Sequence, residues 1–167
     1  MLLSLPAESK PSHRIPLTQE RMALLEQVNV HVNSTIQEVS DLEQYSRDDV
    51  WALPTSGRGD CEDFALLKRK LLIERGFPAA SLTIDVGLTG GGEPHAVLMV
   101  ITADGDYVLD NLHQAALPAH RSTFTPHSRR SKKGFAALSG GMSRYPPIDF
   151  PVAAVAKSIS IAHRTTR

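Results

Sequence analysis

The chain has 167 residues, which fits one domain large enough to bury a hydrophobic core. Its single cysteine excludes an internal disulfide framework, so the fold must be held by packing. No apolar run approaches the roughly 18 residues of a membrane-spanning helix, so no membrane span is expected.

Charge is distributed unevenly, although the formal net charge is zero. Residues 1–120 carry 9 Lys and Arg against 17 Asp and Glu, whereas residues 121–167 carry 9 against 1. The tail is therefore basic. Its pairs Arg129-Arg130 and Lys132-Lys133 have no interleaved aromatic residues, which favours a solvated segment over a nucleic-acid or anionic-membrane site. We expect no nucleic-acid partner.

The N-terminal third predicts an extended segment, a helix and a loop. Prolines at 6, 11 and 16 indicate an extended lead-in over residues 1–17. Thr18 is the expected N-cap of a helix whose apolar residues recur at helical spacing: Met22, Leu25, Val28, Val32, Ile36 and Val39. Residues 40–59 indicate a loop, in which Trp51 is expected to anchor the core, with a substrate wall as the alternative.

A second amphipathic helix is predicted from about Cys61 to Arg75. Acidic residues in its first turn and basic residues later match the helix dipole. Gly76 and Pro78 are expected to end it. Its apolar face consists of Phe64, Leu67, Leu71 and Leu72.

Three strands are predicted next, over residues 82–88, 95–101 and 107–109. Asp104-Gly105 is the expected hairpin turn between the last two strands. Two helices followed by an antiparallel meander indicate an α+β domain over residues 18–122. In the basic segment 123–167, only residues 135–138 and 150–161 have the pattern of packed elements, and no strands that would complete the sheet are recognised.

Cys61 lies where a glycine-rich loop becomes a helix, which makes it a candidate nucleophile. The helix dipole and free N–H groups of a first turn lower a thiol pKa. The neighbouring carboxylates of Asp60, Glu62 and Asp63 oppose this effect, so a bound cation or protonated His95 would have to offset them. The alternative is a cysteine that is a small buried hydrophobic residue.

His95 and Asp110 follow Cys61 in the chain and complete a candidate Cys-His-Asp set. The thiol needs an imidazole within reach, and a carboxylate must hold the second ring nitrogen. A two-residue turn at Asp104-Gly105 would place Asp110 opposite Met99, four residues or roughly 13 Å from His95. A bulge, a longer loop or strand twist would have to close that gap.

Three sequence blocks, with residues 51–54 upstream, resemble the bacterial transglutaminase-like cysteine peptidases, including the LapG-type members. These blocks are residues 59–63, 94–98 and 108–112, and the resemblance covers roughly residues 25–120. It implies a papain-like, transglutaminase-like α+β fold in which a cysteine at a helix N-terminus packs on an antiparallel sheet. Cys61 would be the nucleophile, His95 the general base and acid, and Asp110 the residue that orients His95.

The resemblance also implies a metal, a substrate and a location. Carboxylates flanking the cysteine of LapG-type members bind calcium, which carries over to Asp60 and Glu62, with Asp63 as a further candidate. Ca²⁺ would not be required for the chemistry itself. The expected activity is endopeptidase cleavage of a protein, a large surface adhesin by resemblance, through a thioacyl intermediate.

Two other functions fit the same residues: acyl transfer to an amine, and a non-catalytic binding module with this fold. Family members are typically exported, so the resemblance implies a periplasmic protein. Residues 1–6 lack the pattern of a secretory signal, and the protein would be cytoplasmic if no signal exists.

Overall fold

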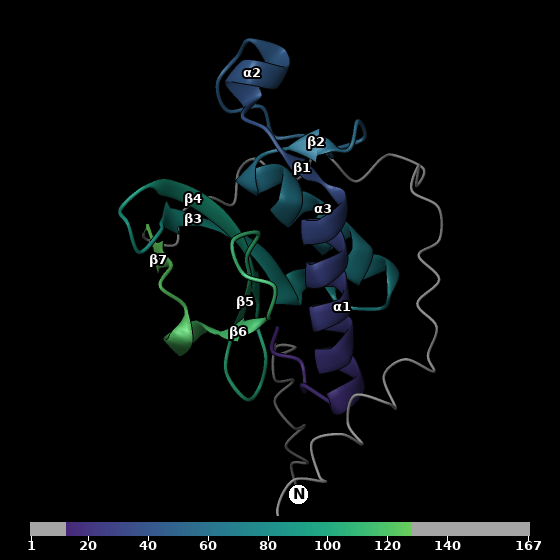
Figure 1. Ribbon diagram of the computed structural model, residues 1–167. Helices are drawn as coiled ribbons and strands as arrows, with labels where there is room; N and C mark the ends of the chain where they lie inside the picture. Colours follow the sequence, from purple (N-terminus) through teal and green to yellow (C-terminus); the bar gives the residue numbers. More distant parts are fainter. Residues whose placement is uncertain (1–12, 128–167) are drawn as a thin grey trace, which may run out of the picture. The chain divides into compact units, whose positions relative to one another are not determined.

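The structure, a computed structural model, describes residues 13–127. Within this range, helices pack on an antiparallel sheet, and the predicted α+β class is confirmed (Figure 1). The segments 135–138 and 150–161, and most of the lead-in, lie outside the described residues. Among the described helices, none is long and apolar enough to cross a membrane.

The first predicted helix is confirmed as α1, Gln19–Thr35. Thr18 is its N-cap, and the Thr18 hydroxyl accepts a hydrogen bond from the Arg21 N–H at 3.2 Å. Val39 lies beyond the end of the helix, although the apolar pattern had included it. The buried residues of α1 are Leu25, Val28, Asn29 and Val32.

The segment expected to be a loop contains short elements that periodicity could not reveal. Helix α2 is Asp41–Tyr45, with Ser40 as its N-cap. Strands β1, Gln37–Glu38, and β2, Arg58–Gly59, pair in parallel. Trp51 is only partly buried, and its indole Nε1 donates to Asp49 Oδ1 at 2.7 Å, so it is not the expected core anchor.

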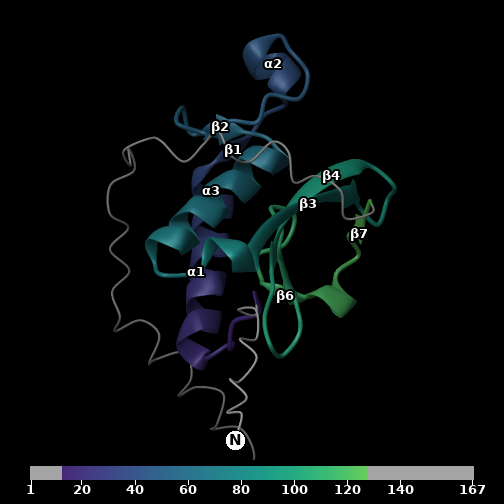
Figure 2. The ribbon, with the colours of Figure 1, turned by 180° about the vertical axis from the view of Figure 1, so that it is seen from behind.

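The second predicted helix is confirmed as α3, Cys61–Glu74, which packs against α1 and the sheet (Figure 2). Gly76, at φ +87°, ends it, since its N–H donates to the Ile73 carbonyl at 3.0 Å. All four predicted apolar residues are buried. Lys68, one of the basic residues that follow the acidic first turn, is completely buried with them.

The sheet contains the three predicted strands and two short additional ones. They are β3 Leu82–Leu88, β4 Pro94–Val100, β5 Tyr107–Leu109, β6 Leu117–Pro118 and β7 Thr125–Pro126, in the order β6-β5-β4-β3-β7. Short 3₁₀ turns cover Ala79–Ser81 and Ala119–Arg121.

Strand β7 extends the sheet past residue 122 by pairing with β3. A Cβ on Gly87 would lie 2.1 Å from the Thr125 carbonyl oxygen, so this close pairing needs a glycine. Apolar and polar residues alternate along β3, but burial does not follow this alternation, because Val86 is 40% exposed.

Candidate active site

The register of β4 and β5 brings Asp110 to His95. Val100 pairs with Tyr107 and Leu98 with Leu109, which places Asp110 opposite Val97. The expected two-residue turn at Asp104-Gly105 is wrong: residues 101–106 connect the strands. The offset between His95 and Asp110 is therefore two residues instead of four.

His95 and Asp110 form a buried hydrogen bond, with His95 Nε2 at 2.8 Å from Asp110 Oδ1. The two residues are 7% and 5% exposed. Burial alone would raise the pKa of Asp110. The His95 hydrogen bond, the Leu112 N–H and the charges of His95 and Lys68 outweigh burial and hold that pKa below its ordinary value. Asp110 is therefore an anion at neutral pH and fixes one ring nitrogen of His95.

Two asparagines of α1 hold the turn that follows β5. Asn29 Nδ2 donates to the carbonyls of His113 and Gln114, at 2.7 and 2.9 Å. Asn33 Nδ2 donates to the carbonyls of Asp110 and His113, at 2.9 and 3.0 Å. Sequence reasoning did not single out this pair. The sequence does contain a sign of this role, because Asn29 is a polar residue within an apolar helical stripe and Asn33 lies one turn later on the same face.

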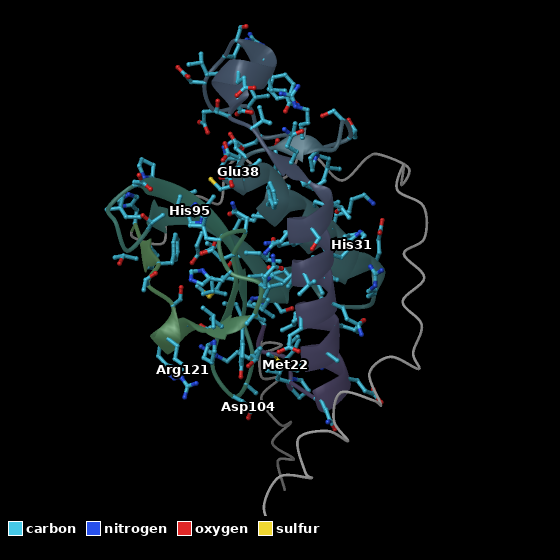
Figure 3. The ribbon with its side chains drawn as sticks, in the orientation of Figure 1. Met22, His31, Glu38, His95, Asp104 and Arg121 are labelled. Carbon is cyan, nitrogen blue, oxygen red and sulfur yellow. The ribbon has the colours of Figure 1, made fainter. Side chains whose placement is uncertain are left out.

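Phe124 packs edge-on against His95, a contact also not foreseen from the sequence. The two ring centroids lie 6.4 Å apart at an interplanar angle of 66°, an edge-on arrangement. Phe124 belongs to a buried cluster with Val97, Met99 and Val108. His95, shown on the sheet in Figure 3, is thus held by a carboxylate and by an aromatic ring.

Cys61 is the first residue of α3 and is partly buried next to the start of β4. The backbone N–H of Ala96, the residue after His95, hydrogen-bonds its sulfur and lowers the thiol pKa. Burial, the Glu62 hydrogen bond and carboxylate charges nevertheless raise that pKa to about 12. Without a bound cation, these effects outweigh the lowering of the Cys61 pKa that was expected from the helix dipole.

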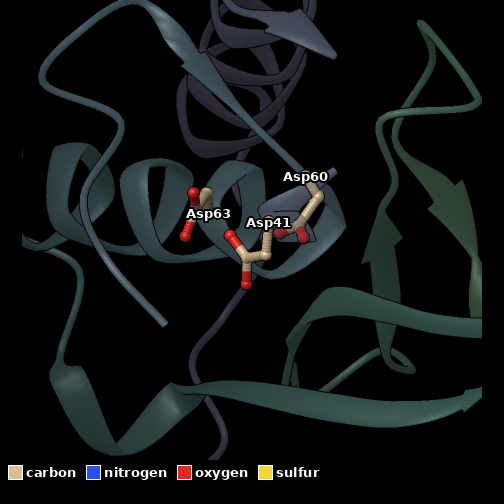
Figure 4. Close-up of side chains that lie close together, drawn as sticks. All are labelled: Asp41, Asp60 and Asp63. Atoms are coloured by element: carbon tan, nitrogen blue, oxygen red, sulfur yellow. The ribbon is translucent and has the colours of Figure 1, made fainter. Parts of the chain in front are cut away.

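Three carboxylates meet beside the start of α3: Asp41 of α2, Asp60 at the N-cap of α3, and Asp63 in its first turn (Figure 4). One oxygen of each lies within 4.8 Å of one oxygen of each of the others. Glu62, expected as a ligand, is not in this cluster. Its Oε2 instead accepts a hydrogen bond from the Cys61 thiol at 3.2 Å.

The cluster has the oxygen atoms that a hard divalent cation requires. Asp41 Oδ1, Asp60 Oδ1 and Asp63 Oδ2 are buried without a hydrogen-bond partner. Burial, a side-chain hydrogen bond with Glu62 and the neighbouring carboxylate charges raise the pKa of Asp60 to about 8. Burial and neighbouring charges also raise the pKa of Asp63 to about 7, although the hydrogen bond from the Ala52 N–H partly offsets them. Buried, unpartnered carboxylate oxygens are ligands of the kind that Ca²⁺ and Mg²⁺ take.

Comparisons with known proteins agree with this geometry. Residues 6–137 match the family model of the bacterial transglutaminase-like cysteine proteinases, known as BTLCP. The chain belongs to this family. Among the curated proteins, no match is found.

Solved structures of LapG from Legionella pneumophila are similar to this BTLCP chain. The calcium-bound form is 30% identical with a TM-score of 0.55, and the match covers 62% of this chain and 61% of LapG. The EGTA-treated form is 31% identical with a TM-score of 0.54, covering 62% and 60%. The matches thus span about three fifths of LapG. They confirm the transglutaminase-like fold that the sequence resemblance implied.

Proposed function

We propose that this BTLCP chain is a cysteine endopeptidase in which Cys61 is the nucleophile, His95 the general base and acid, and Asp110 the residue that orients His95. The observation that carries this proposal is the buried 2.8 Å contact between His95 and Asp110 beside the start of α3. A hydrogen-bonded carboxylate and imidazole next to a partly buried thiol match the requirements of thiol catalysis.

The hydrogen bond to Asp110 defines how His95 would act. Because Nε2 donates to the carboxylate, Nδ1 is the nitrogen left to exchange a proton with the Cys61 thiol. The thiolate attacks the peptide carbonyl, the imidazolium protonates the leaving amine, and water hydrolyses the thioacyl enzyme. The Cys61 backbone N–H is the proposed oxyanion donor, because the first N–H groups of a helix have no intrahelical partner.

A peptide digest tests the proposed activity. We expect wild type to cleave and Cys61→Ala and His95→Ala to be inactive, because each lacks one partner of the proton exchange. His120→Gln, an exposed histidine on the 3₁₀ turn at 119–121, is the control and should retain activity. Products joined to an added amine would show acyl transfer instead. Binding without any turnover would show a non-catalytic module.

The proposed substrate is a flexible, exposed segment of a large surface adhesin. The support is membership of the BTLCP family and the likeness to LapG. Candidate surface proteins should be digested with wild type and with Cys61→Ala, and the new N-termini sequenced. A few cuts between folded domains would support the proposal, whereas scattered cuts or identical fragments from both proteins would refute it.

We propose further that Asp41, Asp60 and Asp63 bind calcium. When bound, the ion supplies positive charge beside carboxylates that otherwise oppose thiolate formation. The support is the set of three unpartnered buried oxygens and a similar structure that contains calcium. The glycine at 59 adds to it, since a Cβ there would lie 2.6 Å from Asp63 Oδ2.

Thermal unfolding tests the calcium site independently of peptidase activity. Calcium should raise the Tm of the EGTA-treated protein. At a free calcium concentration one hundred times the Kd, the folded state should be stabilised by about 2.7 kcal/mol. Asp41→Asn should remove this response, while Asp48→Asn, an exposed carboxylate seven residues later, should retain it. An equal response in both variants would refute the assignment.

A further inference from the structure

The backbone on either side of Trp51 is bound to two members of the three-carboxylate cluster. The Val50 N–H, immediately before Trp51, donates to Asp41 Oδ2. The Ala52 N–H, immediately after it, donates to Asp63 Oδ1 at 2.9 Å. A segment that the proposed chemistry does not use is therefore attached directly to the proposed calcium ligands.

Asp41 and Asp63 each use one oxygen for this segment and have the other oxygen free. Within residues 13–127, Asp41 Oδ1 and Asp63 Oδ2 are buried and have no hydrogen-bond partner. The two residues are 4% and 0% exposed. Buried polar atoms normally have partners, so the two free oxygens point to a ligand beyond the segment. Because both oxygens belong to one planar carboxylate, a cation and the segment would constrain the same side chain.

The Trp51 segment, residues 50–52, lies against the first turn of α3. Asp63 belongs to that turn, and the turn begins with the proposed nucleophile Cys61. Trp51 itself is partly buried, and its indole donates to Asp49 in the same stretch of chain. A change at the carboxylate cluster therefore acts directly on the backbone next to Trp51 and on the turn that carries the nucleophile.

Without a cation, the carboxylate cluster is a poor anchor for the segment. Its members, Asp41, Asp60 and Asp63, have oxygens within 4.8 Å of one another (Figure 4). Like charges at this separation repel, and they repel more strongly in a buried site than in water. A divalent cation attracts all three carboxylates instead. It would hold Asp41 and Asp63 in the positions from which they bind the segment.

We propose that the cation site regulates the Trp51 segment: an ion bound by the carboxylate cluster holds the segment against the first turn of α3, and loss of the ion releases it. This inference rests on the calcium site proposed above and adds what that ion controls. Opening of the segment would move two of the side chains that bind the ion. Opening and ion binding therefore compete, and each weakens the other by the same factor.

Hydrogen exchange of the Val50 and Ala52 amides, measured by NMR, tests this coupling without peptidase turnover. At a free calcium concentration one hundred times the Kd, both amides should exchange about one hundred-fold more slowly than in the EGTA-treated protein, because only the closed segment binds the ion. The Leu112 N–H is the matched control. It also donates to an aspartate, Asp110 Oδ1, at 2.9 Å, and its exchange should not change. Equal slowing of all three amides would mean that calcium stabilises the whole fold, and the proposal would be wrong.

Asp41→Asn separates the charge of the cluster from its hydrogen bond, because an amide oxygen can still accept the Val50 N–H. In this variant calcium should leave the exchange of Ala52 unchanged, whereas Asp48→Asn should respond like wild type. Trp51 is the only tryptophan of the chain, so its fluorescence reports on the segment. Calcium should reduce acrylamide quenching of this fluorescence in wild type and Asp48→Asn. An equal reduction in Asp41→Asn would contradict the proposal.

The outcomes separate this proposal from those on which it rests. If calcium raises the Tm but leaves Val50 and Ala52 exchanging at the EGTA rate, the ion binds without controlling the segment and this proposal is overturned. If calcium changes neither the Tm nor the exchange, the calcium site and its control of the segment are both overturned. Calcium-dependent exchange in a protein that cleaves nothing would refute the peptidase and leave the coupling intact.

Discussion

Asn29 offers a direct test of how the turn that carries Asp110 is held in place. Asn29→Ala removes two hydrogen bonds, at 2.7 and 2.9 Å, to the carbonyls of His113 and Gln114. A neutral hydrogen bond contributes about 1 kcal/mol net, so the free energy of unfolding should fall by about 2 kcal/mol. For a chain of this size that corresponds to a Tm lower by about 4–8 °C.

The same substitution should slow the chemistry, because the turn carries Asp110. We expect slower alkylation of Cys61 at neutral pH, measured at a temperature where the variant is fully folded. Asn33→Ala should behave similarly, since Asn33 binds the Asp110 carbonyl itself at 2.9 Å. Ser34→Ala is the matched control: it lies on the exposed side of α1, and its hydroxyl bonds only within the helix, to the Val30 carbonyl.

Chemical denaturation of all three variants measures their stability, and Cys61 alkylation measures the effect on the site. If Asn29→Ala costs no more stability than Ser34→Ala, the two hydrogen bonds do not hold the turn. If stability falls but Cys61 reacts at the wild-type rate, α1 supports the fold without positioning Asp110.

Three further outcomes follow from the site. The pKa values of Asp60 and Asp63 are raised in the folded chain, so the folded state binds protons more tightly than the unfolded state. The EGTA-treated protein should therefore become more stable to urea as pH falls from about 8 toward about 4. Saturating calcium should weaken that trend. Asp110→Asn should slow Cys61 alkylation strongly, since the amide no longer supplies the charge that stabilises the imidazolium; a wild-type rate would remove Asp110 from the catalytic set. Gly59→Ala should weaken calcium binding in a thermal-shift titration, because the new Cβ would lie 2.6 Å from Asp63 Oδ2, while Gly91→Ala, with its nearest neighbouring atom at 3.6 Å, should not.

The long elements of this fold could be predicted from sequence because each repeats a pattern over several turns or residues. The buried stripe of α1 and the capping residue Thr18 defined its start, and the acidic first turn and Gly76 bounded α3. Helix α2 and strands β6 and β7 span two to five residues, too few for any periodicity to appear.

The register between β4 and β5 could not be predicted from the turn signal. Asp-Gly is a strong hairpin signal, and Gly105 does adopt a positive φ, of +120°. The strands nevertheless pair Val100 with Tyr107, and the Thr102 hydroxyl donates to the Gly105 carbonyl inside a longer connection. Thr102 is itself bridged to Ile15, a residue 87 positions earlier. A contact this distant is not visible in the local sequence.

The acidic residues around Cys61 show how the folded chain regroups carboxylates that are adjacent in the sequence. Successive helical residues point about 100° apart, so the side chains of Glu62 and Asp63 point in different directions. Residues three apart share a face, which is how Asp60 and Asp63 meet while Glu62 turns toward the thiol. The third carboxylate, Asp41, comes from the short helix α2, where its backbone partner is the Val50 N–H. Because sequence separation conceals Asp41, only the folded chain brings Asp41, Asp60 and Asp63 together at the start of α3.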